Sequence, residues 1–459
     1  MRRIKTPRIR LSSVKLIPLS FFLTIALGTL LLMLPAACAP GERTGITTAL
    51  FTATSSVCVT GLVVVDTYAH WSLFGQIVIL LLIQVGGLGV VTVASLILLA
   101  EKKKFTLKDR RLLNDSLNID KNRGLLSFLI RIFRGTFLVE GVGALLYAVR
   151  FVPLLGPARG LWASVFQAVS AFCNAGMDVV GPNSMIDFQT SPLLMGVTMA
   201  LIVLGGLGFV VWFDLLDTVR SGIRNRLSPG RTLRRLPEHS KLVLALTAVL
   251  ILSGAAGILL AEYHNPATLG ALPFSGKLLN SLFQSVTCRT AGFASVPQEK
   301  LTETSCMIGC ILMFIGGSPV GTAGGVKTVT AFLVFMNAFS YIHGRTENVV
   351  FRRRVTGEMM RKASAIVFVS ACVACAMTLL LLSRGGIALT DALYEIFSAL
   401  GTVGLSRGLT PTLDVGGRLI VTASMYLGRI GPISMALFFA RAAGSENMLR
   451  HADGIFYVG

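Results

Sequence analysis

The stretch LFTATSSVCVTG at residues 50–61 decides the fold, because the chain carries three further versions of it. These read VFQAVSAFCNAG (165–176), LFQSVTCRTAG (282–292) and LYEIFSALGTVG (393–404). The closing glycines lie 115, 116 and 112 residues apart, close to one quarter of the 459-residue chain. A repeat at a fixed period predicts an architecture of similar units, each contributing one loop that ends in glycine.

The composition places these four stretches in a membrane protein. Hydrophobic residues make up 53% of the chain and charged residues only 14%, which does not fit a soluble protein. About 20 apolar residues in a helix cross a bilayer core of about 30 Å. Six charge-free windows of that kind lie at residues 16–41, 71–100, 191–213, 242–261, 304–326 and 363–383, and two windows that contain charges lie at 128–149 and 419–440. We expect eight spans, the first of which is too long for a signal peptide.

The formal net charge of +20 would favour nucleic acid binding in a soluble chain, but here it predicts topology and no nucleic acid partner. Of the 42 Lys and Arg residues, 29 lie in residues 1–15, 101–123, 220–241, 344–362 and 441–459. Two expected spans separate each of these segments from the next. Since cytoplasmic loops are enriched in Lys and Arg, we expect a multi-pass protein of the inner (cytoplasmic) membrane with both termini in the cytoplasm.

The four repeated stretches fall in the outer segments and are too short to cross the bilayer. Such a segment suits a re-entrant helix, and irregular backbone survives at membrane depth only if protein buries it or it lines a water-filled cavity. Four loops around one axis would supply rings of carbonyl oxygens that replace the hydration shell of a cation. Glycine is needed where φ is positive and neighbouring backbones approach. Tight outer turns between helices are the alternative interpretation.

The expected fold is therefore an all-α polytopic membrane protein with one central pore. Each of four pseudo-repeats consists of a span, a re-entrant pore helix, a filter loop and a second span. The repeats are expected at residues 1–123, 124–237, 238–361 and 362–459.

A second motif follows each loop by 24 to 29 residues. It reads GGLG at 86–89 and at 205–208, where packing of helices through small residues is the competing interpretation. In the third quarter GGSPVGTAGGVK at 316–327 cannot form regular helix, because proline removes a donor and glycine costs about 1 kcal/mol relative to alanine. We expect a break in mid-membrane that acts as a gate, with a static kinked helix as the alternative.

In the fourth quarter the motif reads GRIG at 428–431, so Arg429 takes the place of a glycine. A charge near the bilayer centre costs at least about 2.5 kcal/mol and should face the protein interior or the pore. An electrostatic barrier to cations is the favoured role. Pairing with Glu140 or with a carbonyl of a pore helix is the alternative.

Taken together, the four loops, the glycine-rich break and the run from Leu427 to Pro432 resemble the Trk/Ktr/HKT superfamily of potassium transporters, and most of all its KtrB type of membrane subunit. The resemblance covers essentially the whole chain and implies potassium uptake. It implies a filter of backbone oxygens at Val59, Thr60, Gly61, Asn174, Ala175, Gly176, Thr290, Ala291, Gly292, Thr402, Val403 and Gly404. It implies a gate in the loop of Gly316, Gly317, Ser318, Gly321, Thr322, Gly324, Gly325 and Lys327.

The resemblance also implies partners and ions. A homodimer in the lipid bilayer is expected to sit on a cytosolic KtrA-like ring that binds nucleotides. Potassium is the substrate, sodium the candidate activator, and no cofactor is expected in this chain. In this superfamily a serine at the first filter position accompanies sodium selectivity, and here that position is Gly61, which supports potassium.

Two features depart from the simplest form of this picture. The third filter loop is one residue shorter, and Arg289 must point away from the permeant ion that it would otherwise repel. Asp66 and Asp178 follow the first two filters and could concentrate cations, although a solvated rim is an equal interpretation.

Other function classes receive less support from the sequence. An alternating-access cation symporter is the alternative function, but its usual inverted repeats or paired mid-membrane acids are not evident. The sequence contains no HExxH, GxSxG or P-loop motif, so we expect no enzyme. Its eight cysteines and five histidines form no pattern typical of a metal site or a disulfide framework.

Overall fold

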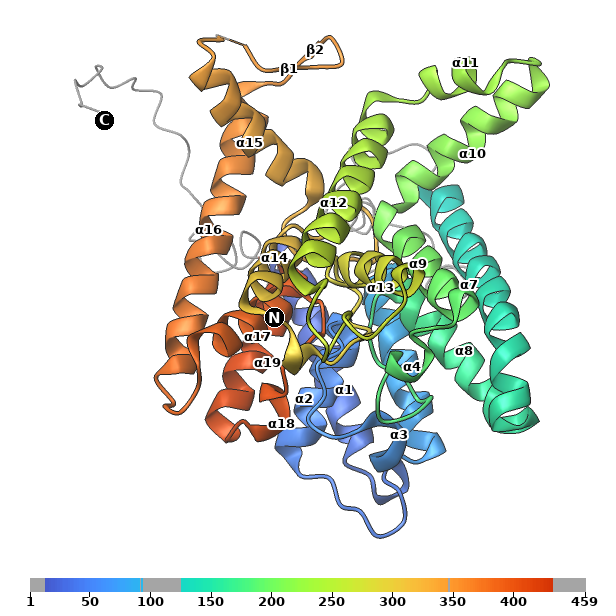
Figure 1. Cartoon of the computed structure of the whole chain (residues 1–459), viewed down its shortest axis with the longest axis vertical. Coiled ribbons are helices and arrows are strands. Elements are labelled where there is room, and N and C mark those ends of the chain that lie inside the picture. The colour runs from blue at the N-terminus through green and yellow to red at the C-terminus, as the bar shows by residue number, and fades with distance from the viewer. Residues whose placement is uncertain (1–12, 91, 94–124, 346, 432–459) are drawn as a thin grey trace, which may run out of the picture.

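The computed structural model describes residues 13–90, 92–93, 125–345 and 347–431. These residues are mostly helical, and a two-stranded antiparallel hairpin of β1 (Val349–Val350) and β2 (Arg353–Arg354) lies at one end of the molecule (Figure 1). The four repeated stretches become short helices near the centre, and longer helices flank them.

The helices follow the expected order within each quarter. The first holds α1 (Ser13–Leu32), a 3-10 turn (Pro35–Ala37), α2 (Ile46–Cys58), α3 (Thr67–His70) and α4 (Leu73–Leu88). The second holds α7 (Leu125–Leu155), α8 (Pro157–Cys173), a 3-10 turn (Ile186–Phe188), α9 (Pro192–Leu207), α10 (Phe209–Arg224) and α11 (Pro229–Arg234). The third holds α12 (Glu238–Glu262), α13 (Phe274–Thr287), a 3-10 turn (Gln298–Lys300), α14 (Glu303–Phe314) and α15 (Thr328–Ile342). The fourth holds α16 (Gly357–Leu382), α17 (Leu389–Gly401), α18 (Leu409–Thr412) and α19 (Val415–Ile430).

The helices that contain the repeats, α2, α8, α13 and α17, connect the quarters in a cyclic order. The helix after each loop packs against the repeat helix of the next quarter: α4 against α8, α9 against α13, α14 against α17, and α19 back against α2. The aromatic residue in the second position of each repeat fills the core between them. Phe51, Phe166, Phe283 and Tyr394 are all fully buried.

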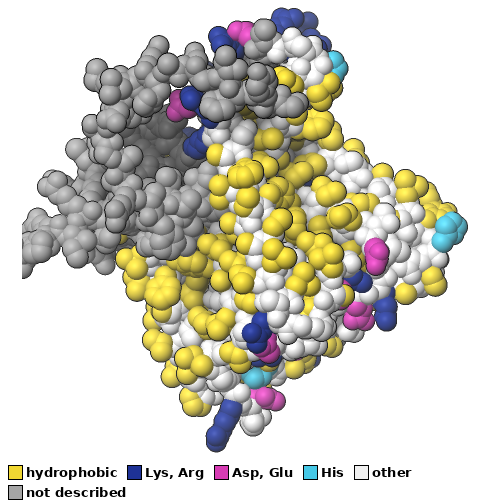
Figure 2. Space-filling model, turned by 90° about the vertical axis from the view of Figure 1, so that its left-hand side faces the viewer, with side chains coloured by type: hydrophobic (Ala, Val, Ile, Leu, Met, Phe, Trp, Pro, Cys, Tyr) yellow, Lys and Arg dark blue, Asp and Glu magenta, His cyan; other side chains and the backbone are white. Residues whose placement is uncertain are grey.

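The outer surface is apolar. On the long helices α7, α12 and α16, side chains such as Leu138, Leu260 and Phe368 are 69%, 80% and 70% exposed. Figure 2 shows a broad field of hydrophobic side chains, with most Lys, Arg, Asp and Glu side chains gathered toward its ends. An exposed apolar surface of this extent marks contact with an apolar medium rather than with water, as expected for an integral membrane protein.

Among the described residues, three helical segments are long and apolar enough to cross a membrane: Ser127–Leu155, Glu238–Glu262 and Gly357–Leu382. The pair α9 and α10, bent by 99° at one break, counts as a fourth. Shorter apolar helices occur at Leu16–Leu32, Ile46–Cys58, Leu73–Leu88, Glu303–Phe314 and Thr328–Ile342. The remaining expected spans are thus not single long helices in this part of the chain.

The second motif of each quarter explains why these helices are short. Helices α4, α9 and α19 end at Gly89, Gly208 and Gly431, which have nearly the same φ of 88°, 88° and 89°. A positive φ ends a right-handed helix, and glycine adopts it without steric cost. In the third quarter the break is longer, because α14 ends at Phe314 and α15 begins only at Thr328.

Candidate functional site

The four loops that end in glycine meet in a closed ring. A Cβ atom added to any of their final glycines would come closer than 3.0 Å to a backbone carbonyl oxygen of the next loop. The pairs are Gly61 with Ala175, Gly176 with Ala291, Gly292 with Val403, and Gly404 with Thr60. Since the last pair returns to the first loop, the structure brings all four expected filter segments together around one point.

The backbone of each loop repeats one unusual conformation. In every filter triplet the first and third residues have positive φ: 55° and 99° at Val59 and Gly61, and 52° and 98° at Thr402 and Gly404. The other two loops follow the same pattern at Asn174, Gly176, Thr290 and Gly292. A β-branched residue such as Val59 is a genuine outlier at positive φ, and such strain, about 1–3 kcal/mol per residue, persists mainly at functional sites.

Buried hydroxyl groups hold these loops in place. Ser55 and Ser398 each accept a hydrogen bond of 3.0 Å, from the backbone N–H of Gly61 and Gly404 respectively. In the other two loops the hydroxyl donates instead, from Ser170 to the carbonyl of Met177 at 2.5 Å and from Thr287 to that of Phe293 at 2.8 Å. Sequence reasoning did not single out these four residues, although Ser or Thr occupies the corresponding position in every repeat.

The third loop reaches the ring by a different local path. Where α2, α8 and α17 are capped by a residue with left-handed backbone, α13 is capped by Cys288 in a right-handed conformation. Thr290 then takes the positive φ of 76°. The missing residue is therefore absorbed at the helix end, and Gly292 still joins the ring.

The predicted interruption after α14 is confirmed as a loop from Ile315 to Lys327. It runs beside the break in α9: the N–H of Ser318 donates to the carbonyl of Gly206 at 3.0 Å, and that of Thr322 to Gly205 at 3.2 Å. The Thr322 hydroxyl also donates to the carbonyl of Phe172 at the end of α8, at 3.2 Å. Every residue expected in the gate lies in this loop.

The same loop lies against the ring itself. A Cβ atom added to Gly324 would collide with the side chain of Thr402 in the fourth filter triplet. Only a residue without a side chain fits between the loop and the ring at this point. The end of the loop is fixed by Lys327, whose ammonium group donates to the carbonyl of Ala323 at 2.6 Å.

Comparison with known proteins agrees with this geometry. Residues 12–451 match the TrkH family, described as a cation transport protein. The chain is 38% identical to the potassium/sodium uptake protein NtpJ of Enterococcus hirae, over 93% of this chain and 92% of that protein. It is 36% identical to the Ktr system potassium uptake protein B of Bacillus subtilis, over 98% of each.

The chain belongs to the TrkH cation transport family. The fold agrees, because the crystal structure of the potassium transporter TrkH from Vibrio parahaemolyticus superposes with a TM-score of 0.73 over 96% of this chain and 87% of that one, at 17% identity. This family consists of membrane cation transporters rather than enzymes.

In this member of the TrkH family, Arg429 does not pair with Glu140, which corrects one of the expected alternatives. Its guanidinium group donates to the carbonyl of Thr322 in the loop after α14 and to the carbonyl of Gly86 near the end of α4. Two backbone carbonyls from different quarters therefore hold this charge. The bonds tie the fourth quarter to the loop and to the first quarter.

Glu140 belongs to a separate buried group. Its carboxyl group accepts a hydrogen bond of 3.2 Å from the amide of Gln84, and the Cys173 thiol lies 3.9 Å away. Cys173 is the last residue of α8, directly before the filter triplet at Asn174. The acid thus stabilises the back of the second loop.

The first glycine of the second motif has a packing role, as the competing interpretation proposed. A Cβ atom at Gly86, Gly205 or Gly428 would collide with a carbonyl oxygen at the end of a repeat helix, on Val57, Phe172 and Leu400 respectively. The last glycine of the same motif breaks the helix. Packing and interruption are therefore combined within four residues.

Proposed function

We propose that this chain takes up potassium across the cytoplasmic membrane through a filter made by the four loops. The ring of Gly61, Gly176, Gly292 and Gly404 carries this proposal. Its tight packing excludes side chains and leaves backbone carbonyls as the polar groups available to a permeating ion, the arrangement that replaces the hydration shell of a cation. The printed names of the relatives support potassium, and one also names sodium.

We also propose that the chain consists of four repeats with eight spans around this pore. The cyclic packing of α4, α9, α14 and α19 against the repeat helices supports it. Each of these helices would be the first half of a span whose second half begins after the glycine break. The repeat boundaries proposed are 1–123, 124–237, 238–361 and 362–459.

The loop from Gly316 to Lys327 is proposed as the gate beneath the filter, with Arg429 as its anchor and as a barrier to cations. The support is the position of the loop against Thr402 and its bond from Arg429. A loop held by a few hydrogen bonds to backbone carbonyls can be displaced at modest cost, about 0.5–1.5 kcal/mol for each neutral bond.

The remaining parts of the proposal concern partners, ions and orientation. The Ktr system named in two relatives supports a homodimer that works with a cytosolic KtrA-like nucleotide-binding ring, and sodium as an activator. The basic segments support cytoplasmic termini in the inner membrane.

Growth of a potassium-uptake-deficient bacterium in low potassium tests this function. Expression of the chain, alone and together with a nucleotide-binding regulatory subunit, should restore growth and uptake of a potassium tracer. The control is Gly176→Val, which fills the ring and should abolish rescue while the protein still reaches the membrane. Rescue that is equally strong with the ring filled would contradict the filter.

A further inference from the structure

Arg289 has an environment that the proposed transport path does not explain. Its side chain is only 7% exposed, and no hydrogen bond or ion pair to it occurs among the described residues. Its Nε–H is buried without an acceptor. A buried charge that lacks a partner is costly, so an unpaired guanidinium group at this depth calls for a counter-charge.

The guanidinium group borders a small enclosed cavity behind the third loop. The cavity has a volume of about 10 Å³ and is lined by Arg289, Thr247 and Ile251, by residues of α9 including Gly206, and by Gly317. It holds one small occupant. Arg289 thus points toward α9 and α12, as the sequence analysis required of a cation so close to the permeant ion.

A second unpartnered polar group lines the same cavity. The hydroxyl group of Thr247, on α12, is buried and makes no hydrogen bond among the residues that the structure describes. A guanidinium group and a hydroxyl group can both donate to one acceptor between them. None of the residues that line the cavity is Asp or Glu, so the protein supplies no negative charge there.

We propose that this cavity is a binding site for a small inorganic anion of the halide class, held by Arg289 and Thr247. A halide provides the missing negative charge, accepts hydrogen bonds from both side chains and needs no donor in return. A single water molecule would accept the bonds but would leave the charge uncompensated. The anion would also cancel the field of Arg289 next to the third loop; that consequence rests on the proposed function, whereas the binding itself does not.

The position of the site gives the anion a structural role. Gly317 belongs to the loop after α14, and Gly206 lies at the break of α9, where it accepts a hydrogen bond from Ser318. The bound anion would therefore be in contact with the third filter loop and with the proposed gate at the same time. Its loss should loosen both.

Bromide provides a direct probe, because it scatters anomalously and replaces chloride. Crystals of the full-length protein in potassium bromide should give an anomalous peak in the cavity beside Arg289 and Thr247. Density for water alone, or a peak only elsewhere on the protein, would overturn the proposal.

A solution experiment tests the two side chains without measuring transport. Unfolding followed by the intrinsic fluorescence of the three tryptophans should show a Tm that rises as chloride replaces gluconate at constant potassium and ionic strength. Arg289→Gln should remove this dependence. Thr247→Val, which keeps the shape of the side chain and is the variant expected to fold normally, should weaken the apparent chloride affinity by about tenfold.

The matched control is Arg131→Gln on α7, whose side chain is 61% exposed. It removes the same charge and should leave the chloride dependence of Tm as in the wild type. A chloride dependence unchanged in Thr247→Val and Arg289→Gln would overturn the site, even if potassium uptake is normal. Failure of uptake with an intact bromide peak would instead contradict only the proposed function.

Discussion

At the scale of single residues, the most sensitive position is Gly61. Its φ of 99° disfavours any side chain, and a Cβ atom would lie 2.5 Å from the carbonyl oxygen of Ala175. Gly61→Ser should therefore push the first and second loops apart and reduce the preference for potassium over sodium by about tenfold, or about 1.4 kcal/mol. Fluxes of both ions in proteoliposomes measure it.

Gly196→Ser on α9 is the matched control for this substitution. Gly196 has no atom within 4 Å of an added Cβ, so the same change of residue should leave selectivity as in the wild type. If Gly61→Ser also retains wild-type selectivity, the ring of glycines does not select the ion.

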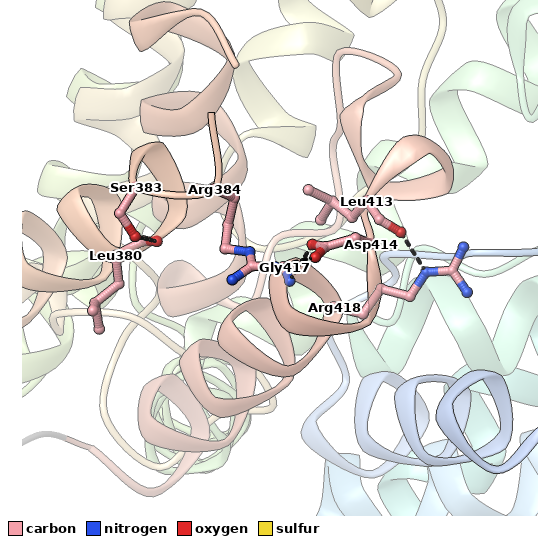
Figure 3. A network of polar contacts seen from close by, with 7 residues as sticks. All are labelled: Leu380, Ser383, Arg384, Leu413, Asp414, Gly417 and Arg418. Atoms are coloured by element: carbon pink, nitrogen blue, oxygen red, sulfur yellow. Dashed lines mark hydrogen bonds and ion pairs between the residues drawn. The ribbon is translucent and has the colours of Figure 1, made fainter. Parts of the chain in front are cut away.

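Asp414 is a residue whose charge affects stability with pH. It caps α19 by accepting a bond of 2.8 Å from the N–H of Gly417, and it pairs with Arg384 (Figure 3). The hydrogen bond from Arg384, followed by that from Gly417, holds the pKa of Asp414 below its ordinary value. A lowered pKa adds stability that is complete above the unfolded value of about 3.9 and is lost as the pH falls toward the folded value.

We therefore expect Asp414→Asn to lose stability at pH 7 and to show a flatter decline of Tm below about pH 4. Arg384→Gln should have a similar effect, because it removes the partner. Arg418→Gln is the control, since Arg418 donates to the backbone carbonyls of Leu413 and Pro411 instead (Figure 3). Acid-side slopes that match the wild type in both Asp414→Asn and Arg384→Gln would exclude this contribution.

At the scale of structural elements, the loop from Gly316 to Lys327 depends on Arg429. Arg429→Ala removes two charge-assisted hydrogen bonds, each worth about 1.5–3 kcal/mol. If the loop is the gate, its closed state loses preference and the transport rate should rise about tenfold or more, as measured by tracer uptake in proteoliposomes. Removal of part of Gly316 to Gly325 should have the same direction.

The outcomes of this experiment separate the possible roles of Arg429. Arg418→Ala, on the same helix, is the control and should leave the rate unchanged. A lower rate with normal amounts of folded Arg429→Ala protein would show that the residue supports the pathway instead of restraining it. A folded loop deletion with an unchanged rate would exclude the gate.

The sequence predicted these elements to different degrees. Spacing of the glycines predicted the four loops and the break after Phe314, because a repeated pattern and a run of glycine with proline are local signals. It did not predict the carbonyl partners of Arg429, which lie 107 and 343 residues away in the chain. The positions at which α4 and α9 end were also missed, because glycines that pack and glycines that break a helix look alike in sequence.

At the scale of the whole molecule, the proposed orientation can be tested with reporters. Green fluorescent protein fused after Gly344, in the basic connection from α15 to α16, should fluoresce because this connection is expected in the cytoplasm. Alkaline phosphatase fused after Gly385, in the turn from α16 to α17, should be active because that turn is expected outside. The opposite pattern would reverse the topology.

The closed order of α2, α8, α13 and α17 has a consequence for how mutations act. Because one covalent chain supplies all four sides of the ring, a point mutation alters a single side, whereas in a ring of four identical subunits it would alter all of them. Successive substitution of Gly61, Gly176, Gly292 and Gly404 can thus be used as a graded dose, from one altered wall to four. It also leaves each wall free to specialise, as the third has done with its shorter loop and the fourth with Arg429.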